Sequence, residues 1–246
     1  MHLKVYNAII YTKLIITSLV FSYDGFDREV FVTKNVKLEV GNFAADFEIP
    51  WGMAFLPDTS MLVTDLSGSL YRVYQDGNKD VIKGIPNVVY KGQGGLLDVE
   101  VHPDFLENNY IYVSYSQPKK GKAFTAVARA KLIRNQLEDF EIIYSTEYKH
   151  YSRKTVHFGS RFAISGDYLF FSIGDRGERD EAQDLDKPNG KIHRLHLDGR
   201  VPSDNPFKSK NGDVSTIWCY GNRNPQGLTF SKEGVLWESE HGPRGG

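Results

Sequence analysis

One short pattern returns four times along this chain, and it constrains the fold more than any other feature. Each copy is an apolar strand, a turn built from Pro, Gly, Asp or Asn, and a second apolar strand, which is the signature of a β-hairpin. The copies recur roughly every 45 to 65 residues, the length of one propeller blade. They occupy residues 52–65, 98–115, 161–173 and 227–239.

Further strand candidates lie between these hairpins, at residues 69–74 and 126–132, and no long segment has the 3.6-residue period of a helix. The sequence therefore predicts an all-β protein, a β-propeller. A β-sandwich also has many short strands, but it gives no reason for one hairpin formula to return four times. Four hairpins supply about four blades at most. Because the chain stops in the turn-forming residues 240–246, we expect an incomplete propeller that lacks its last blades.

The composition excludes several classes of protein. Of the 246 residues, 40% are hydrophobic and 25% are charged, which rules out a disordered chain and a protein with several membrane spans. The 30 Lys and Arg residues are balanced by 31 Asp and Glu residues, whereas a dedicated nucleic-acid binder needs a cationic surplus. Cys219 is the single cysteine, so the chain forms neither an intramolecular disulfide nor a Cys-rich zinc site.

The first 22 residues have the pattern of a secretory signal peptide. Lys4 and Lys13 precede the apolar run at residues 14–21, and Ser22 is small enough to precede the cleavage site. The run is shorter than the about 20 residues that cross a bilayer. We expect a periplasmic or secreted protein without integral membrane contact, whose partial propeller catalytic domain is residues 23–246. The alternative is a hydrophobic strand before the domain.

Three segments interrupt the repeat, and departures from a regular scaffold are where functional sites are expected. Residues 92–98 contain three glycines, which let the backbone approach a ligand closely and present Gln93 on a tight turn. Residues 221–227 set Arg223 and Asn224 beside a proline, where their donors are suited to a carboxylate or an oxyanion. Taken alone, each segment also fits an ordinary turn.

The remaining segment contains His157, and Asp175 follows one hairpin later. If that hairpin folds as predicted, His157 enters one strand and Asp175 leaves its antiparallel partner. Both side chains then lie at one end of one blade, within hydrogen-bond reach. An imidazole oriented by a carboxylate can act as a general base at neutral pH. The alternative is a surface histidine near an acidic turn.

Read in order, the motifs of the chain resemble the glucose/sorbosone dehydrogenase family, and they look closest to its bacterial aldose sugar dehydrogenase branch. The resemblance covers nearly everything from Phe47 onward. Each motif is weak alone, but together they are specific. They occupy residues 49–57, 92–105, 157–161, 172–175, 190–192, 198–207, 221–227 and 240–246.

This resemblance implies a soluble, six-bladed propeller enzyme that uses pyrroloquinoline quinone (PQQ) and calcium. Such an enzyme oxidises an aldose sugar at C1 to the lactone and passes the electrons to a soluble acceptor. The resemblance assigns His157 as the base that removes the proton of the C1 hydroxyl while hydride passes to the quinone. Asp175 is assigned as the orienting carboxylate, and Arg223 lies by the quinone carbonyl that gains negative charge.

The same resemblance places Gln93 and Asn224 at the cofactor, and it assigns the carbonyl groups of Gly242 and Pro243 to the calcium ion. Ser160 departs from the pattern, because the family usually has a glycine there, and we expect the turn after His157 to be crowded.

Further acidic and basic site residues of the family would lie beyond residue 246, so we expect little or no activity from this chain alone. Two alternatives stay open. A non-catalytic propeller that binds a sugar or a protein would need no base and cation at one pocket. A propeller lactonase, which is a calcium-dependent hydrolase, would not need the run at residues 223–226.

Overall fold

The computed structural model describes residues 28–242, which belong to two compact units. The predicted signal peptide, residues 1–22, lies outside the described residues. In the first unit, β1 (Arg28–Val32) and β2 (Lys37–Gly41) pair as an antiparallel hairpin, and all five residues of β2 are exposed. The second unit holds residues 47–74 and 79–242, and it contains all the other strands and helices.

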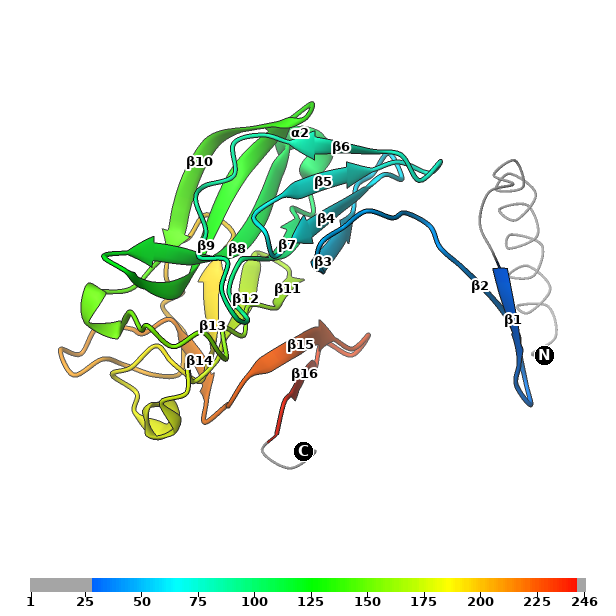
Figure 1. Ribbon diagram of the computed structural model, residues 1–246. Coiled ribbons are helices and arrows are strands. Elements are labelled where there is room, and N and C mark those ends of the chain that lie inside the picture. Colours follow the sequence, from blue (N-terminus) through cyan, green and yellow to red (C-terminus); the bar gives the residue numbers. More distant parts are fainter. Residues whose placement is uncertain (1–27, 243–246) are drawn as a thin grey trace. The chain divides into compact units, whose positions relative to one another are not determined.

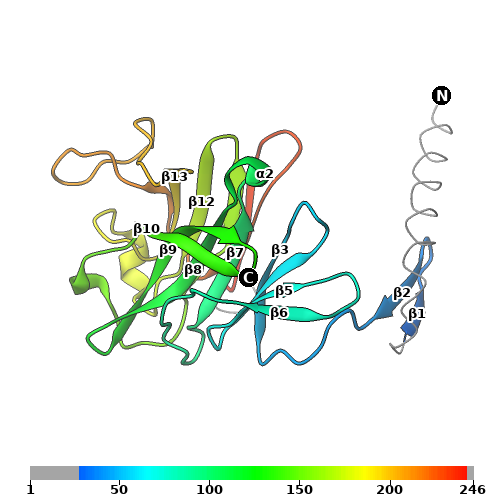
Figure 2. The ribbon, with the colours of Figure 1, turned by 90° about the horizontal axis from the view of Figure 1, so that it is seen from above.

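Four antiparallel sheets follow one another along the second unit (Figures 1 and 2). In each sheet the strands pair in chain order, so every sheet is a simple meander. The first sheet contains β3 (Pro50–Phe55), β4 (Met61–Asp65), β5 (Leu70–Val73) and β6 (Lys79–Ile82). The second contains β7 (Leu96–Val101), β8 (Tyr110–Lys119), β9 (Lys122–Ile133) and β10 (Gln136–Tyr144).

The third sheet contains β11 (Phe162–Ser165), β12 (Tyr168–Ile173), β13 (Lys191–His196) and β14 (Ile217–Tyr220), and the fourth contains β15 (Pro225–Phe230) and β16 (Leu236–Glu240). The helices are short and lie between strands: α2 (Phe105–Asn108), η1 (Tyr148–His150) and η2 (Arg179–Gln183). No helix within residues 28–242 is long and apolar enough to span a bilayer.

The repeat in the sequence marks the first two strands of each sheet. The four predicted hairpins are present as β3–β4, β7–β8, β11–β12 and β15–β16, and the two further strand candidates correspond to β5 and β9. The described residues therefore contain three complete four-stranded blades and the first two strands of a fourth. The prediction of an all-β, incomplete propeller is confirmed.

The core lies between successive sheets. Side chains of β8 alternate in direction, as they do along any strand. Ile111 and Val113 pack against Leu62 of the first sheet, while Tyr112, between them in sequence, packs against Phe171 of the third sheet. Because the middle of β8 is buried on both faces, residues 110–113 are an unbroken apolar run, and Ser114 and Ser116 occupy buried positions beyond it. This face-to-face packing of neighbouring sheets stabilises the blades.

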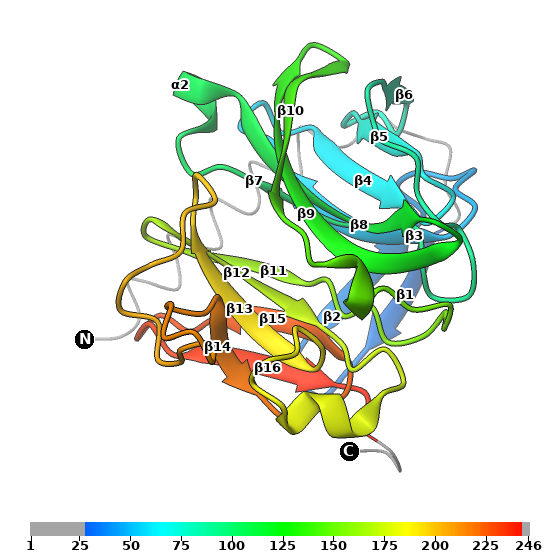
Figure 3. The same cartoon turned by 90° about the vertical axis from the view of Figure 1, so that its left-hand side faces the viewer.

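The first strand of each sheet is the innermost, and consecutive innermost strands contact one another, β3 with β7, β7 with β11 and β11 with β15 (Figure 3). The segments that enter these strands are also joined directly. The N–H of His157, before β11, donates to Oε1 of Gln93, before β7. The N–H of Gly159 donates to Oδ1 of Asn224, before β15. The fold thus gathers three separate segments at one end of the sheets.

Candidate active site

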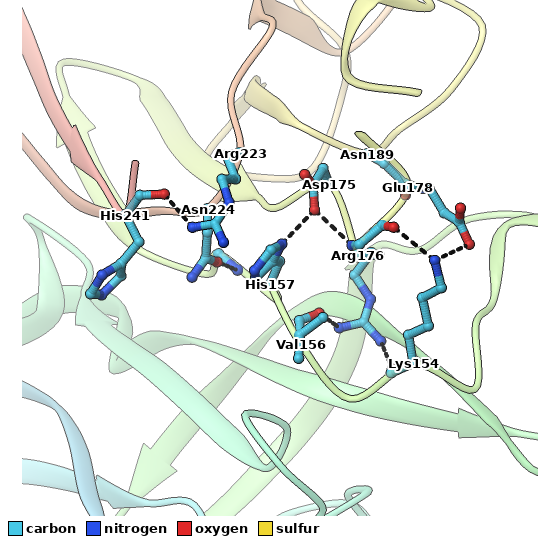
Figure 4. Close-up of polar contacts among 12 residues, drawn as sticks. Lys154, Val156, His157, Asp175, Arg176, Glu178, Asn189, Arg223, Asn224 and His241 are labelled. Carbon is cyan, nitrogen blue, oxygen red and sulfur yellow. Dashed lines mark hydrogen bonds and ion pairs between the residues drawn. The ribbon is translucent and has the colours of Figure 1, made fainter. Parts of the chain in front are cut away.

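The imidazole of His157 and the carboxylate of Asp175 form a hydrogen bond at this end of the third sheet (Figure 4). His157 precedes β11 and Asp175 follows β12, and these strands pair with Phe162 opposite Phe171. Nδ1 of His157 lies 2.6 Å from Oδ1 of Asp175. The exposed fractions of the two side chains are 15% and 5%. The predicted meeting of these two residues is confirmed.

This pairing determines which nitrogen of His157 is available. A carboxylate accepts hydrogen bonds, so the neutral ring carries its hydrogen on Nδ1 and its lone pair on Nε2. Within the described part of the chain, Nε2 has no hydrogen-bond partner. Asp175 is itself fixed by the N–H of Gly177, which donates to Oδ1 at 2.6 Å. A free basic nitrogen with an oriented carboxylate behind the ring is the arrangement of a general base.

The backbone of His157 is held in an uncommon conformation. Its φ of +54° lies in the left-handed region, which residues with a Cβ rarely adopt. Its N–H donates to Oε1 of Gln93 at 2.7 Å. Its carbonyl oxygen lies against Gly174, where a Cβ would come within 2.3 Å of that oxygen. Backbone strain of this kind persists where the surroundings fix a functional side chain.

Arg176 fastens the segment that carries His157, although nothing in the sequence pattern singled it out. Its guanidinium is buried and donates to the carbonyl oxygens of Lys154 and Val156, each at 2.6 Å (Figure 4). The guanidinium carbon also lies 3.3 Å from the centre of the Phe158 ring. Burial lowers the pKa of Arg176 to about 9, so the group is still cationic at neutral pH. The signal that could have found it is its place directly after Asp175 in a glycine turn.

Arg223 and Asn224 come to the same end of the sheets from the segment between β14 and β15. Nη1 of Arg223 donates to the carbonyl oxygen of His241 at 2.6 Å. The carbonyl oxygen of Arg223 accepts the N–H of Asp175 at 2.7 Å. Asn224 is only 1% exposed, and its Oδ1 accepts the N–H of Gly159 at 3.1 Å. Asn224 therefore braces the turn after His157, while Arg223 is half-buried and lines the open space beside it.

A cavity of about 570 Å³ opens between these segments, a volume typical of small-molecule sites. His157, Asp175 and Arg223 all line it, so the imidazole and the guanidinium share one space, as the sequence predicts. Gln93 contacts His157 but does not line the cavity. The other lining residues are Gly177, Arg179, Asp180, Ala182, Gln183, Gly221, Asn222 and Glu240.

Three carboxylates, those of Asp175, Asp180 and Glu240, share the cavity with two guanidinium groups. The N–H donors in and beside the cavity are suited to the oxygens of a planar, anionic quinone such as PQQ. Arg223 commits Nη1 to the protein, and a guanidinium has further N–H groups for a carboxylate or a quinone oxygen. Gln93 uses its amide oxygen for His157, which leaves its amide nitrogen as a donor. Arg179 adds a second guanidinium to the cavity wall.

The described residues do not complete a calcium site. Calcium takes roughly six to eight oxygen ligands. Within residues 28–242, no group of three or more His, Cys, Asp and Glu side chains could hold a metal ion. Of the two carbonyl groups assigned to calcium by resemblance, that of Gly242 belongs to the described part of the chain, and that of Pro243 lies outside it. Calcium stays a prediction.

Fold and cavity together define a class of protein, a β-propeller with a polar cavity where the segments entering its innermost strands meet. The chain belongs to the glucose/sorbosone dehydrogenase family, whose model matches residues 47–246. The aldose sugar dehydrogenase YliI of Escherichia coli (strain K12) is 42% identical over 204 residues, which are 80% of this chain and 54% of that protein.

Two solved structures are similar as well. The apo form of the soluble aldose sugar dehydrogenase from Escherichia coli has a TM-score of 0.77 and 37% identity, with 89% of this chain and 61% of that chain covered. The PQQ-bound form of an aldose sugar dehydrogenase from Streptomyces coelicolor has a TM-score of 0.73 and 26% identity, with the same 89% and 61% covered. The chain spans about half the length of the curated relatives it matches.

Proposed function

We propose that this protein oxidises aldose sugars at C1 to the lactone with PQQ as the hydride acceptor. One observation carries the proposal: a histidine with a free basic nitrogen and a half-buried arginine line the same cavity. The family supports the sugar dehydrogenase assignment, and the PQQ-bound relative supports the cofactor.

In this proposal Nε2 of His157 takes the proton of the C1 hydroxyl. The C1–H bond breaks with its electron pair, the C1–O double bond forms, and the sugar thus loses one proton and one hydride. PQQ, when bound, supplies the acceptor for that hydride. Asp175 keeps the imidazole in the correct tautomer and stabilises the imidazolium that forms. Arg223 provides positive charge at the cavity wall, where negative charge develops.

Gln93, which touches the cavity wall through His157, is proposed to bind the cofactor through its amide nitrogen, because its amide oxygen accepts the N–H of His157. Asn224 does not line the cavity and is only 1% exposed, so we propose that it serves the cofactor site by holding the turn after His157. The carbonyl groups of Gly242 and Pro243 would hold a calcium ion beside it. Export to the periplasm or the medium follows from the signal pattern of residues 1–22, and a soluble acceptor would take up the electrons. Cell fractionation with an antibody against the protein tests the location.

The proposal is tested with the protein expressed whole from its gene and supplied with PQQ and Ca²⁺. We expect glucose or another aldose to reduce a dye acceptor, with one lactone formed per two electrons. Arg223→Gln should lower kcat by about 10²-fold, the usual effect of removing one donor at a developing negative charge. Lys232→Gln, in the β15–β16 turn, is the control and should leave kcat unchanged.

Other results would replace the proposal. Lactone hydrolysis without reduction of the dye would identify a propeller lactonase. Binding of a sugar without any turnover, in a protein that has bound PQQ, would identify a non-catalytic binding module.

A further inference from the structure

We propose that a basic patch beside the cavity is the docking surface for an acidic protein that accepts one electron at a time. This inference rests on the proposed dehydrogenase function. The basic patch consists of six cationic side chains from two segments, the turn between β8 and β9 and the residues of and after η1. They are Lys119, Lys120, Lys122, Lys149, Arg153 and Lys154.

The two segments are held together by the backbone. The N–H of Ala123 donates to the carbonyl oxygen of Ser152 at 2.8 Å, and the N–H of Ser152 donates back at 3.1 Å. This pair of hydrogen bonds joins the start of β9 to the chain just after η1. Lysines from one segment and cationic residues from the other therefore share one surface.

Three of the lysines are ordered on tyrosine rings of the second segment. Nζ of Lys122 lies 4.9 Å and Nζ of Lys120 lies 5.6 Å from the centre of the Tyr148 ring. Nζ of Lys119 lies 5.4 Å from the Tyr151 ring. A cation over an aromatic face is attracted to it. These ammonium groups are thus already positioned, which lowers the side-chain entropy that a partner must overcome on binding.

The patch carries more positive charge than nearby carboxylates neutralise. Glu147 pairs with Lys149 and Glu178 pairs with Lys154, each at 2.8 Å, and the other four cations have no ion pair within the described residues. In the neighbouring acidic loop, Glu181 and Asp186 are paired with Lys187 and Lys210, whereas Asp180 and Asp184 have no ion pair within the described residues, so four unpaired cations of the patch face two unpaired carboxylates of that loop. In a chain with a net charge of −1, a local excess of this kind steers an anionic partner.

The basic patch is continuous with the cavity. Nζ of Lys154 donates to the carbonyl oxygen of Gly177 at 2.7 Å, and Gly177 lines the cavity. The carbonyl oxygen of Lys154 accepts from Arg176, the residue that holds the segment of His157. A protein bound to the patch would therefore lie next to the place where the electrons of the sugar arrive.

The chemistry of the reaction is compatible with such a partner. Oxidation of one aldose to its lactone releases two electrons and two protons. A one-electron acceptor, such as a ferric haem protein, must therefore be reduced twice per sugar, two Fe(III) to two Fe(II), while the protons go to solvent. Electron-transfer complexes are small and transient, so complementary charge is the feature that selects the partner and accelerates the encounter.

The probe is cytochrome c in two forms, the native basic protein and its succinylated form, in which lysine ammonium groups are replaced by carboxylates. Size and haem are the same, and the charge is reversed. The protein expressed whole, with PQQ and Ca²⁺, should reduce the succinylated form at least about ten-fold faster than the native form at low ionic strength, and salt should abolish the difference.

The patch variant is Lys119→Glu with Lys120→Glu, at the exposed tip of the β8–β9 turn. The control is Lys208→Glu with Lys232→Glu, which makes the same change of charge in exposed turns that join β13 to β14 and β15 to β16. Each rate is divided by the rate of the same variant with a small neutral dye. We expect the patch variant to lose about ten-fold in the reduction of succinylated cytochrome c and the control to change less than two-fold.

Binding is measured separately by sedimentation of the succinylated cytochrome with the protein, without sugar or PQQ. Binding that is lost in the patch variant supports the docking surface even if no aldose turnover is found, a result that would overturn the proposed function alone. Equal losses in both variants would show an effect of net charge and overturn the docking surface. If the protein binds phosphatidylglycerol vesicles and the patch substitutions leave cytochrome reduction unchanged, the patch belongs to an anionic lipid surface. That result would also overturn the docking surface for a protein.

Discussion

The cavity and the interior of the sheets each contain a histidine, but the two differ in what is left unpaired. At the cavity, His157 gives Nδ1 to Asp175 and keeps Nε2 free. In β13, Nδ1 of His193 bonds Oγ1 of Thr216 at 2.8 Å, and Nε2 bonds the carbonyl oxygen of Pro188 at 3.1 Å. Burial lowers the pKa of His193 to about 3, so this ring stays neutral and has no nitrogen available to a substrate.

The two aspartates differ in the same way. Asp175 lies beside open space and orients an imidazole. Asp98, in β7, is enclosed: its Oδ1 bonds Nη1 of Arg161 at 2.8 Å, and its Oδ2 accepts the N–H of Phe162 at 2.7 Å. Burial outweighs the attraction of Arg161 and raises the pKa of Asp98 to about 7. Burial and a shifted pKa are therefore not sufficient for chemistry, which needs an unpaired atom beside a cavity.

The largest expected effect on kcat comes from substituting each of the two histidines in turn. His157→Gln removes the proposed base and should lower kcat by about 10²–10⁴-fold, with little change in the free energy of unfolding. His193→Gln should lower that free energy by about 2–3 kcal/mol, because it removes the ring stacked on Phe171 and disturbs two buried hydrogen bonds. Its kcat should be unchanged below the unfolding transition. Dye reduction measures kcat, and urea unfolding measures the free energy of unfolding. Equal losses of kcat in the two variants would refute the distinction between a catalytic His157 and a structural His193.

A smaller loss of kcat is expected from Asp175→Asn. The amide at position 175 can donate to Nδ1, which would move the hydrogen of the imidazole to Nε2 and occupy the lone pair that takes the proton. We expect kcat to fall by about 10²-fold or more while KM changes little. Asp98→Asn, a neutralised carboxylate away from the cavity, serves as the control. The NMR signals of the His157 ring nitrogens report the tautomer directly, and an unchanged tautomer would contradict the role of Asp175.

The fold could be predicted from the sequence because the first two strands of every sheet follow the same sequence pattern. Apolar residues on both faces and a turn of Gly, Pro, Asp or Asn mark each such hairpin. The outer strands follow a weaker pattern, since β6 and β10 lie at the sheet edges and about half of their residues are exposed. The hairpin β1–β2 was not predicted either, because β2 is exposed at all five positions and its alternation indicates no buried face.

The candidate site could be predicted in part. The hairpin geometry alone places His157 beside Asp175. The meeting of Gln93, His157 and Arg223 depends on contacts between three sheets, which no spacing within one segment shows. Arg176 was missed because a buried arginine is recognised by its partners, here two carbonyl oxygens and an aromatic ring.

A pH dependence separates the two aspartates further. The pKa of Asp98 is about 7 in the folded protein and about 3.9 in an unfolded chain, so the folded state holds the proton more tightly. This contribution is fully present below about pH 4 and is lost as the pH rises to about 7, by an amount on the order of 2–4 kcal/mol. Buried His193 contributes a slope of opposite sign over a similar pH range, so the Asp98 slope is read from the difference in the free energy of unfolding between the wild type and Asp98→Asn. That difference should fall as the pH rises from about 4 to about 7. The exposed Asp213→Asn is the control and should show no such difference from the wild type; a difference for Asp98→Asn that is constant with pH would overturn the assignment to Asp98.

The smallest expected effect concerns the departure at Ser160, in the turn that follows His157. Ser160 is fully buried with a φ of +88°, a conformation that favours glycine. Its Oγ donates to the carbonyl oxygen of Phe158 at 3.1 Å, which offsets part of the strain. We expect Ser160→Gly to raise the free energy of unfolding by about 0.5–1 kcal/mol. Ser165→Gly, in β11, should lower it by about as much, because that serine has an ordinary strand conformation. If urea midpoints show both variants destabilised, the hydroxyl bond of Ser160 contributes more than its backbone strain costs, and crowding after His157 is not a feature of this turn.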